Sequence, residues 1–409
     1  MLGRNGFLAL LVAAVVALGL ALWLQSGDRT GDGSAPRVGE PLLPGFAEQV
    51  NELQRLEVIL PGSQTLVTLT RGESGWQAVE RDGYPADWDQ LRGLLRGLAQ
   101  AEVVSPKTAR AEHYDQLGVM DVQSPDASGV ELRLGAEPVA SVIVGKSASQ
   151  REGRYVRLRG EQRSYLIDQA LELPTEIGGW LDTDILDIQS SDIAGVTVRH
   201  ADGEVVRIGR DGSDQFALLN LPEGREVSGQ WALNAVANAL TGLSALDVRR
   251  AQGSVPDSAT RVLYTTTDGV NIVVSLFSET PEGSGEDDGG KYLARFEVSR
   301  EPGSEQPAAA AEDAGTGEDE VGAGDQTAAA DGEPATAGST QTGAEQGAAS
   351  GEAIDVETLD VEALAKRLSG WAFELRESKY NAMSKRLEDL LKPQETETEG
   401  ETPTEPTGS

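Results

Sequence analysis

Hydrophobic residues follow two different spacings along this chain, and each spacing predicts a type of element. Several short segments, such as residues 66–69, alternate apolar and polar residues, which predicts half-buried strands. Turn pairs such as Asp202-Gly203 separate these segments, which favours antiparallel hairpins. Residues 87–101 and 228–243 instead place apolar side chains three and four positions apart, which predicts two amphipathic helices.

Small polar residues mark the predicted starts of the helices. Asp87 and Ser228 stand where an N-cap side chain would accept hydrogen bonds from the first turn of each helix. A further helix is predicted over residues 378–391, because it begins with Ser378 and ends before a Lys-Pro pair.

The predicted elements occur twice in the same order. Val58 and Val198 are 140 positions apart in matching strand segments, and so are Trp76 and Phe216. Repeated order at a fixed offset is the mark of an internal duplication. The sequence therefore predicts two copies of one unit rather than two unrelated domains.

A Gly-Trp segment closes each predicted copy, since residues 177–181 resemble residues 368–372 at an offset of 191. The larger offset is explained by an insert over residues 301–353, which contains no aromatic residue, no Lys and no Arg. Such a composition cannot bury enough apolar surface to offset its ordering entropy, so we expect disorder there. The acidic residues 392–409 are expected to behave in the same way.

The complete pattern predicts an α+β fold. An N-terminal transmembrane helix precedes two tandem repeats, each an antiparallel sheet with an amphipathic helix, and a long disordered acidic insert interrupts the second repeat. The predicted boundaries are a cytoplasmic N-terminus at 1–5, a transmembrane anchor at 6–24, a juxtamembrane linker at 25–52, a first repeat at 53–190, a second repeat at 191–300 and 354–391, the insert at 301–353 and a tail at 392–409.

The anchor is predicted from nineteen consecutive residues without a charge, 6–24. As a helix they span about 28 Å, close to the thickness of a bilayer's hydrocarbon core. Arg4 precedes them, and the aromatic residues Phe7 and Trp23 lie near the two ends, where a membrane interface favours such rings. We expect a single-pass protein of a Gram-negative inner membrane, with its bulk in the periplasm.

A cleaved signal peptide is the competing interpretation of this segment. Gly19-Leu20-Ala21 fits the small residues required before a cleavage site, but the apolar run continues beyond it to Leu24. The retained anchor is therefore favoured.

Composition removes several functional classes. The chain has 34 Lys and Arg against 67 Asp and Glu, a net charge of −33, which opposes nucleic-acid binding. It has no cysteine, which excludes thiolate chemistry and disulfides, and it has only two histidines. We expect no enzymatic activity, no cofactor and no metal site, while the oligomeric state stays open.

Three carboxylates that follow Trp180 are the best candidates for a catalytic site in this sequence. Paired carboxylates beside an aromatic ring can indicate glycoside hydrolysis, but the spacing of Asp182, Asp184 and Asp187 does not place two of them across a cleft. A solvated turn is the better interpretation in so acidic a chain.

The two histidines offer no better case for catalysis. A triad with His113 or His200 has no Gly-x-Ser-x-Gly element to accompany it, so exposed or capping roles are favoured. The segment from Asp28 resembles a calcium loop but has Gly39 where a bidentate Glu is needed. Residues 283–290 are glycine-rich but acidic and lack the lysine of a P-loop.

Tryptophans and arginines are the remaining candidates for binding. Core packing is favoured for the tryptophans at repeat-equivalent or element-edge positions, which are Trp76, Trp180, Trp231 and Trp371. One segment concentrates five basic residues, which are Arg151, Arg154, Arg157, Arg159 and Arg163. A solvated strand face is the simpler interpretation of this basic segment, and a docking surface for an acidic partner is the sharper one.

The order of elements resembles the DUF4340 domain proteins of bacterial envelopes over about residues 53–300 and 354–391. The resembling motifs are the N-terminal anchor, Gly75-Trp76, Tyr114-Asp-Gln-Leu-Gly118, Trp180-Leu-Asp-Thr-Asp-Ile-Leu, Ile193-Ala-Gly-Val, Trp371-Ala-Phe-Glu-Leu and Lys385-Arg-Leu-Glu-Asp-Leu-Leu. The resemblance implies a partner, a gliding-motility-type auxiliary ABC transporter with its permease and ATPase.

The function expected from the sequence is therefore a non-enzymatic accessory or scaffold subunit of an ABC-2-type transporter complex. The alternative is a periplasmic binding module for envelope polysaccharide or peptidoglycan. An envelope hydrolase that uses the carboxylates after Trp180 is a third and weaker interpretation.

Overall fold

A computed structural model describes residues 36–135, 140–149, 152–279, 290–300 and 360–393. The chain divides into two units, Met1–Asp182 and Thr183–Ser409. The sequence placed the corresponding boundary after residue 190. The α+β class with two antiparallel sheets, predicted from the sequence, is confirmed.

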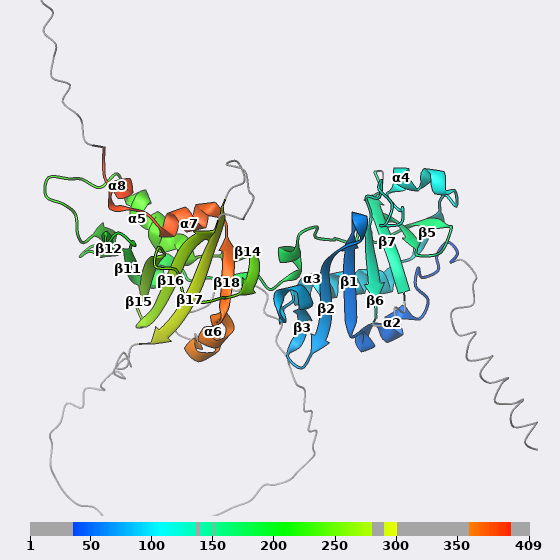
Figure 1. The fold of residues 1–409 in the computed structure, drawn as a ribbon, viewed down its shortest axis with the longest axis horizontal. Coiled ribbons are helices and arrows are strands. Elements are labelled where there is room, and N and C mark those ends of the chain that lie inside the picture. The colour runs from blue at the N-terminus through cyan, green and yellow to red at the C-terminus, as the bar shows by residue number, and fades with distance from the viewer. Residues whose placement is uncertain (1–35, 136–139, 150–151, 280–289, 301–359, 394–409) are drawn as a thin grey trace, which may run out of the picture. The chain divides into compact units, whose positions relative to one another are not determined.

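The first unit is built on a sheet of nine antiparallel strands among the described residues (Figure 1). Their order across the sheet is β4 (Tyr84–Pro85), β3 (Gly75–Ala78), β2 (Gln64–Gly72), β1 (Arg55–Leu60), β6 (Val130–Leu134), β7 (Ala140–Ser147), β8 (Arg154–Leu158), β9 (Ser164–Ile167) and β5 (Val103–Pro106). Its helices are α2 (Phe46–Gln49), α3 (Trp88–Gln100) and α4 (Tyr114–Leu117), with short 3-10 turns η1 (Val50–Glu52), η2 (Pro61–Ser63), η3 (Val79–Arg81), η4 (Ala111–His113) and η5 (Ile177–Trp180).

The second unit has a sheet of the same size within the part of the chain that the structure describes. Its order is β10 (Asp184–Leu186), β14 (Leu243–Arg250), β18 (Trp371–Leu375), β17 (Lys291–Arg300), β16 (Val270–Glu279), β15 (Thr260–Thr266), β11 (Ile193–Arg199), β12 (Val205–Arg210) and β13 (Phe216–Leu218). Its helices are α5 (Gln230–Ala237), α6 (Val361–Leu368), α7 (Glu377–Met383) and α8 (Leu387–Leu390), with 3-10 turns η6 (Ser190–Asp192) and η7 (Asn238–Leu240).

Eight strands follow the same order in both sheets. Reading from β3 to β5 in the first unit gives the same sequence of connections as reading from β13 to β14 in the second. The register agrees as well, because Val58 pairs with Leu132 and its counterpart Val198 pairs with Val262. The two units are thus copies of one topology, and only the strands β4 and β10 lack a counterpart.

Each unit is closed by the same backbone contact at its C-terminal end. An isolated antiparallel bridge joins Ala86 to Leu181 in the first unit, and another joins Val227 to Leu391 in the second. The hydrogen bonds beside the two bridges correspond. In the first unit the Asp87 N–H donates to the Trp180 carbonyl (3.0 Å) and the Asp182 N–H donates to the Pro85 carbonyl (3.0 Å). In the second unit the Ser228 N–H donates to the Leu390 carbonyl (2.8 Å) and the Lys392 N–H donates to the Glu226 carbonyl (2.9 Å). Position 181 therefore corresponds to position 391.

This contact corrects the Gly-Trp alignment made from the sequence. Trp371 opens β18, which corresponds in the sheet order to β9. Trp180 ends the turn η5, which precedes the closing contact and so corresponds to α8. A Gly-Trp pair in both places matched locally, but strand order and backbone pairing show that the two tryptophans hold different positions.

The helix boundaries confirm one predicted cap and correct two other predictions. The Asp87 side chain caps α3 by accepting from the N–H of Gln90 at 3.0 Å. Ser228 does not cap α5, because the cap residue is Gly229 and no side chain accepts there. The single helix predicted over 378–391 is two helices, α7 and α8.

Several sequence predictions fall on residues outside the described ones. These are the N-terminus at 1–5, the anchor at 6–24 with Arg4, Phe7 and Trp23, the linker up to residue 35, Arg151, the calcium-like segment up to residue 35, the glycine-rich residues 283–289, the insert at 301–353 and most of the tail. The rest of the predicted linker, residues 36–52, folds with the first unit: it contains α2 and η1, and Leu42 and Phe46 are buried. Among the residues that are described, no helix is long and apolar enough to cross a membrane.

Candidate functional site

Helix α3 lines a groove in the described part of the first unit. Four leucines, Leu91, Leu94, Leu95 and Leu98, lie on one side of the helix and are almost completely buried. Figure 1 shows α3 lying across the sheet of this unit. Burial of these side chains against the sheet holds the helix in place and leaves its other sides open to solvent.

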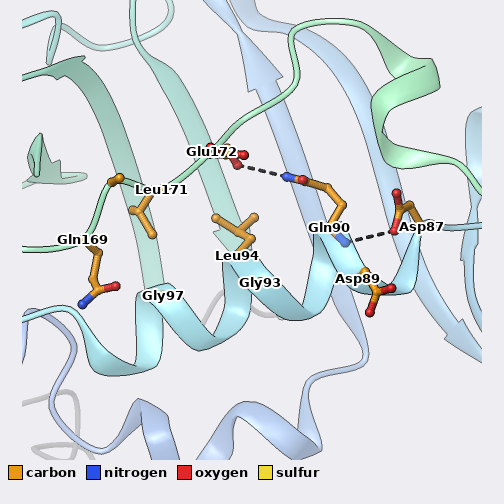
Figure 2. A pocket seen from close by; sticks show the side chains of 10 residues that line it. Asp87, Asp89, Gln90, Gly93, Leu94, Gly97, Gln169, Leu171 and Glu172 are labelled. Atoms are coloured by element: carbon orange, nitrogen blue, oxygen red, sulfur yellow. Dashed lines mark hydrogen bonds between the residues drawn. The ribbon is translucent and has the colours of Figure 1, made fainter. Parts of the chain in front are cut away.

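Two glycines on α3 form the floor of the groove. Gly93 is exposed, and a Cβ atom placed on it would meet no other atom within 4 Å. Gly97 lies one turn further along the helix, and a Cβ there would lie 2.8 Å from Cδ2 of Leu171. Because neither residue has a side chain, the helix backbone is accessible at Gly93 and covered by Leu171 at Gly97 (Figure 2).

The opposite wall is the segment Gln169–Glu172, which follows β9. Arg154 fixes this segment by donating from Nε to the Ala170 carbonyl at 2.9 Å. Gln90 reaches across from α3 and donates to the Glu172 carbonyl at 3.0 Å (Figure 2). Leu171 adopts a φ of 30°, a left-handed conformation that is unfavourable for a residue with a branched side chain. The surrounding contacts thus hold a strained backbone over the helix.

The groove between these walls has a volume of about 550 Å³ and an acidic lining. Its charged lining residues are Asp87, Asp89 and Glu172, and no Lys or Arg is among the ten residues that line it. Asp89 also pairs with Arg92 on α3 at 2.7 Å. Such a groove, with a backbone floor at Gly93 and a negative rim, suits a cationic group.

The basic segment predicted as a possible docking surface is used largely inside the first unit. Arg157 is 3% exposed. Its guanidinium donates to the carbonyls of Val119 (2.8 Å) and Glu161 (3.1 Å), pairs with Asp121 (2.7 Å) and stacks over Tyr114. The structure therefore corrects both interpretations of Arg157, since it lies on neither a solvated face nor an accessible surface.

Arg159 belongs to a charged network around a buried carboxylate, Glu131. The Oε1 atom of Glu131 accepts hydrogen bonds from Arg133 (2.8 Å), Ser141 (2.9 Å) and Arg159 (2.6 Å). Burial raises the pKa of this carboxyl group, but the three hydrogen bonds and the charge of Arg133 outweigh burial and hold the pKa below its ordinary value. Glu131 thus stays charged and fixes the arginines to the sheet.

The remaining arginines of the basic segment are less tightly held. Arg154 is half-buried and fixed to main-chain carbonyls, while Arg163 is exposed and donates to the Lys107 carbonyl at 3.2 Å. A docking role for Arg159 and Arg163, the exposed members, stays a prediction.

The three carboxylates that follow Trp180 lie on two different units. Asp182 ends the first unit, where its carbonyl accepts from the Tyr84 hydroxyl. Asp187, in the second unit, accepts from the main chain of Gly242 at 2.7 Å and from Gln189 at 3.1 Å. Asp184 is exposed at the start of β10. Among the described residues, no group of His, Asp and Glu side chains is arranged to hold a metal ion.

The two histidines have different environments. His113 is partly exposed, with its ring near Glu112 and Gln116. His200 is only 6% exposed, and its ring nitrogens lie 3.2 Å from the Thr260 hydroxyl and 3.3 Å from the Lys385 carbonyl. The expectation of an exposed or capping histidine is therefore wrong for His200, which joins the sheet to the segment between α7 and α8.

Burial separates the tryptophans into two groups. Trp76, Trp180 and Trp371 are buried, as the sequence predicted. Trp231 is 70% exposed, which corrects the prediction of core packing for it, and Trp88 is 49% exposed. Both exposed rings belong to the first turn of the amphipathic helix of their unit. Solvent exposure of so large an apolar ring costs free energy unless a partner covers it.

The groove itself was not predicted from the sequence. The available signal was Gly93-Leu-Leu-Arg-Gly97, because two glycines within a predicted helix weaken it and call for a packing or functional reason. No local sequence pattern indicated the backbone conformation of residues 169–172. That conformation depends on hydrogen bonds with Arg154 and Gln90, which lie far from it along the chain.

A family model described as a domain of unknown function, DUF4340, matches residues 76–263. The match begins in β3 of the first unit and ends in β15 of the second. No curated protein and no solved structure gives a match to the chain. Residues 76–263 therefore match the DUF4340 family that the sequence motifs resemble.

Proposed function

We propose that this protein is a non-enzymatic, membrane-anchored accessory subunit of an ABC-2-type transporter complex of the gliding-motility kind. In this proposal the apolar residues 6–24 hold the chain in the inner membrane, and the two units lie in the periplasm. The resemblance that the sequence shows to transporter-associated envelope proteins supports the choice of partner.

The non-enzymatic part of the proposal rests on one observation: the charged and titratable side chains that could take part in catalysis make structural contacts instead. Arg157, Glu131, Asp187 and His200 all make contacts that hold strands or loops of their own unit. Groups committed in this way are not free to bind a substrate or to move a proton. Among the described residues, the accessible features include an acidic groove and the exposed rings of Trp88 and Trp231, which suit a binding protein.

Affinity purification of the full-length chain from detergent-solubilised membranes tests this function. We expect a permease and an ATPase of the ABC class to be recovered with it. Recovery of the intact, folded chain without either subunit would refute the transporter part of the proposal.

The exposed rings of Trp88 and Trp231 favour a second candidate, binding of envelope polysaccharide or peptidoglycan. Aromatic rings on a protein surface can stack on sugars, and the two units would then provide two such rings. Sedimentation of the full-length chain with insoluble peptidoglycan separates the candidates. Binding that is lost in a Trp88→Ala, Trp231→Ala double variant would favour the glycan, and absence of sedimentation would exclude it.

A further inference from the structure

Because the two units share one topology, the second unit can be compared with the first at the position of the groove. The equivalent helices are related by an offset of 142: Leu91, Leu94, Leu95 and Leu98 are buried in the first unit, and Leu233, Val236, Ala237 and Leu240 are buried in the second. By this correspondence Gly93 matches Ala235 and Gly97 matches Ala239.

Helix α7 lies beside Ala239, the residue that corresponds to Gly97. Lys379 of α7 donates from Nζ to the carbonyls of Ala239 (3.1 Å) and Thr241 (2.6 Å) at the end of the α5–η7 helix. Met383, the last residue of α7, is completely buried. Ala239, the counterpart of Gly97, is 2% exposed. In the second unit the chain therefore covers this helix with a helix of its own.

The segment that lines the groove in the first unit corresponds to α7. Both segments come after equivalent strands, β9 and β18, and both precede the equivalent closing contacts at Leu181 and Leu391. Both also contact the start of the next strand of the sheet: Ala170 binds Arg154 of β8, and Tyr380 packs against Tyr292 of β17 with ring centroids 4.7 Å apart.

The corresponding segment in the first unit forms no helix. Residues 168–176 are described and contain no helical turn. They contact α3 through Leu171, which lies over Gly97, and through the Glu172 carbonyl, which accepts from Gln90. The rest of the position is the groove of about 550 Å³, whose floor at Gly93 is open to solvent. One copy of the repeated fold thus supplies a covering helix, and the other leaves its place unfilled.

We propose that the groove beside α3 receives a short amphipathic helix of a partner protein that carries a Lys or Arg side chain. The inference rests on the proposed accessory function and adds to it the site and the chemistry of the partner. The helical shape is argued from α7, which fills the equivalent position. The basic side chain is argued from the three carboxylates at the rim, Asp87, Asp89 and Glu172.

A partner helix fits the floor of the groove for a specific physical reason. The absence of a side chain at Gly93 lets another backbone approach closely, as small residues do where helices pack together. A basic side chain at the rim would lie near carboxylates with no cation among the lining residues to oppose it.

Site-directed photocrosslinking tests the inference. The chain has no cysteine, so Gln169→Cys places one benzophenone maleimide label on the groove wall of the full-length protein. The labelled protein is irradiated with solubilised membranes, and the crosslinked peptide is identified by mass spectrometry. Arg96→Cys, an exposed position of α3 outside the lining, is the matched control for the label.

The expected adduct joins position 169 to a helical, Lys- or Arg-containing segment of another protein, with no such adduct from position 96. Adding Gly93→Leu to the Gln169→Cys chain places a side chain in the groove from a position whose Cβ meets nothing within 4 Å, and it should lower the yield about tenfold, equivalent to a loss of about 1.4 kcal/mol of binding. Its urea unfolding curve shows whether the variant stays folded.

Three results would overturn the inference: equal yields from positions 169 and 96, an unchanged yield with Gly93→Leu, or an adduct to this chain itself or to a lipid or glycan. Recovery of transporter subunits with the unlabelled chain is measured in the same membranes. Subunits recovered without a groove adduct refute the groove alone, whereas no recovery refutes the proposed function.

Discussion

The main-chain N–H of Asp87 donates to the carbonyl of Trp180 at 3.0 Å, so the residue that caps helix α3 also binds the C-terminal end of its own unit. Ser228 and Leu390 form the same bond at 2.8 Å in the second unit. Each unit therefore closes on the start of its helix, which fixes the helix relative to the last segment of the fold. The groove of the first unit lies between this helix and the segment Gln169–Glu172.

Trp180 and Trp231 should differ strongly in their effect on stability. Trp180 is fully buried and donates from its indole N–H to the Pro174 carbonyl at 3.0 Å, so Trp180→Ala should cost about 3–5 kcal/mol. Trp231 is 70% exposed, so Trp231→Ala should change the free energy of unfolding by less than about 0.5 kcal/mol. Urea unfolding followed by circular dichroism measures both. Equal losses would contradict the assignment of the two rings.

Arg157 should be essential to the fold of the first unit. Arg157→Met removes three hydrogen bonds to fixed partners and leaves the Val119 carbonyl without its donor, so we expect a loss of about 2–4 kcal/mol. Arg163→Met, at an exposed arginine with one weak contact, is the control and should be nearly neutral. Thermal unfolding compares the two, and a neutral Arg157→Met would show that the contacts do not stabilise the unit.

Alanine at the two groove glycines should have different effects. Alanine is favoured over glycine in a helix by about 0.5–1 kcal/mol, and Gly93→Ala should give that gain because a Cβ there meets nothing within 4 Å. At Gly97 the new Cβ would lie 2.8 Å from Leu171 and would force that side chain to move, so Gly97→Ala should lose the gain. Equal stabilisation in urea unfolding would show that Leu171 does not cover Gly97.

Glu131 should make the first unit sensitive to acid. Its pKa in the folded state is held below the ordinary value of 4.5, so its contribution to stability is full above that pH and is lost as pH falls through the folded pKa. We expect the stability difference between the natural chain and Glu131→Gln to be largest near about pH 7 and to shrink below about pH 4.5. Urea unfolding at several pH values measures this.

Glu112→Gln, which changes an exposed carboxylate, is the matched control for the acid series. Its stability difference from the natural chain should stay small at every pH. If Glu131→Gln behaved in the same way, the charged form of Glu131 would not be held by Arg133 and Arg159.

Local patterns predicted those parts of the fold that depend on local interactions. The cap at Asp87 and the apolar side of α3 were predicted because capping and helical periodicity involve residues within a few positions of each other. The strand equivalence of Val58 and Val198 also followed from the repeated order of short segments.

Parts that depend on distant contacts could not be predicted in this way. Trp180 and Trp371 follow similar Gly-rich residues, so the sequence matched them, although their positions are set by the pairing of Leu181 and Leu391 with other segments. Arg157 was assigned to the surface because arginine usually lies there, and its burial depends on carbonyls that lie far along the chain, such as that of Val119.

Quantitative affinity purification of the full-length chain from solubilised membranes is the most direct test of the central claim, that this protein is an accessory subunit of an ABC-2-type transporter. The proposal predicts that a permease and an ATPase are recovered in fixed proportion to the chain. Recovery of the intact chain in the membrane fraction with neither subunit bound would contradict it.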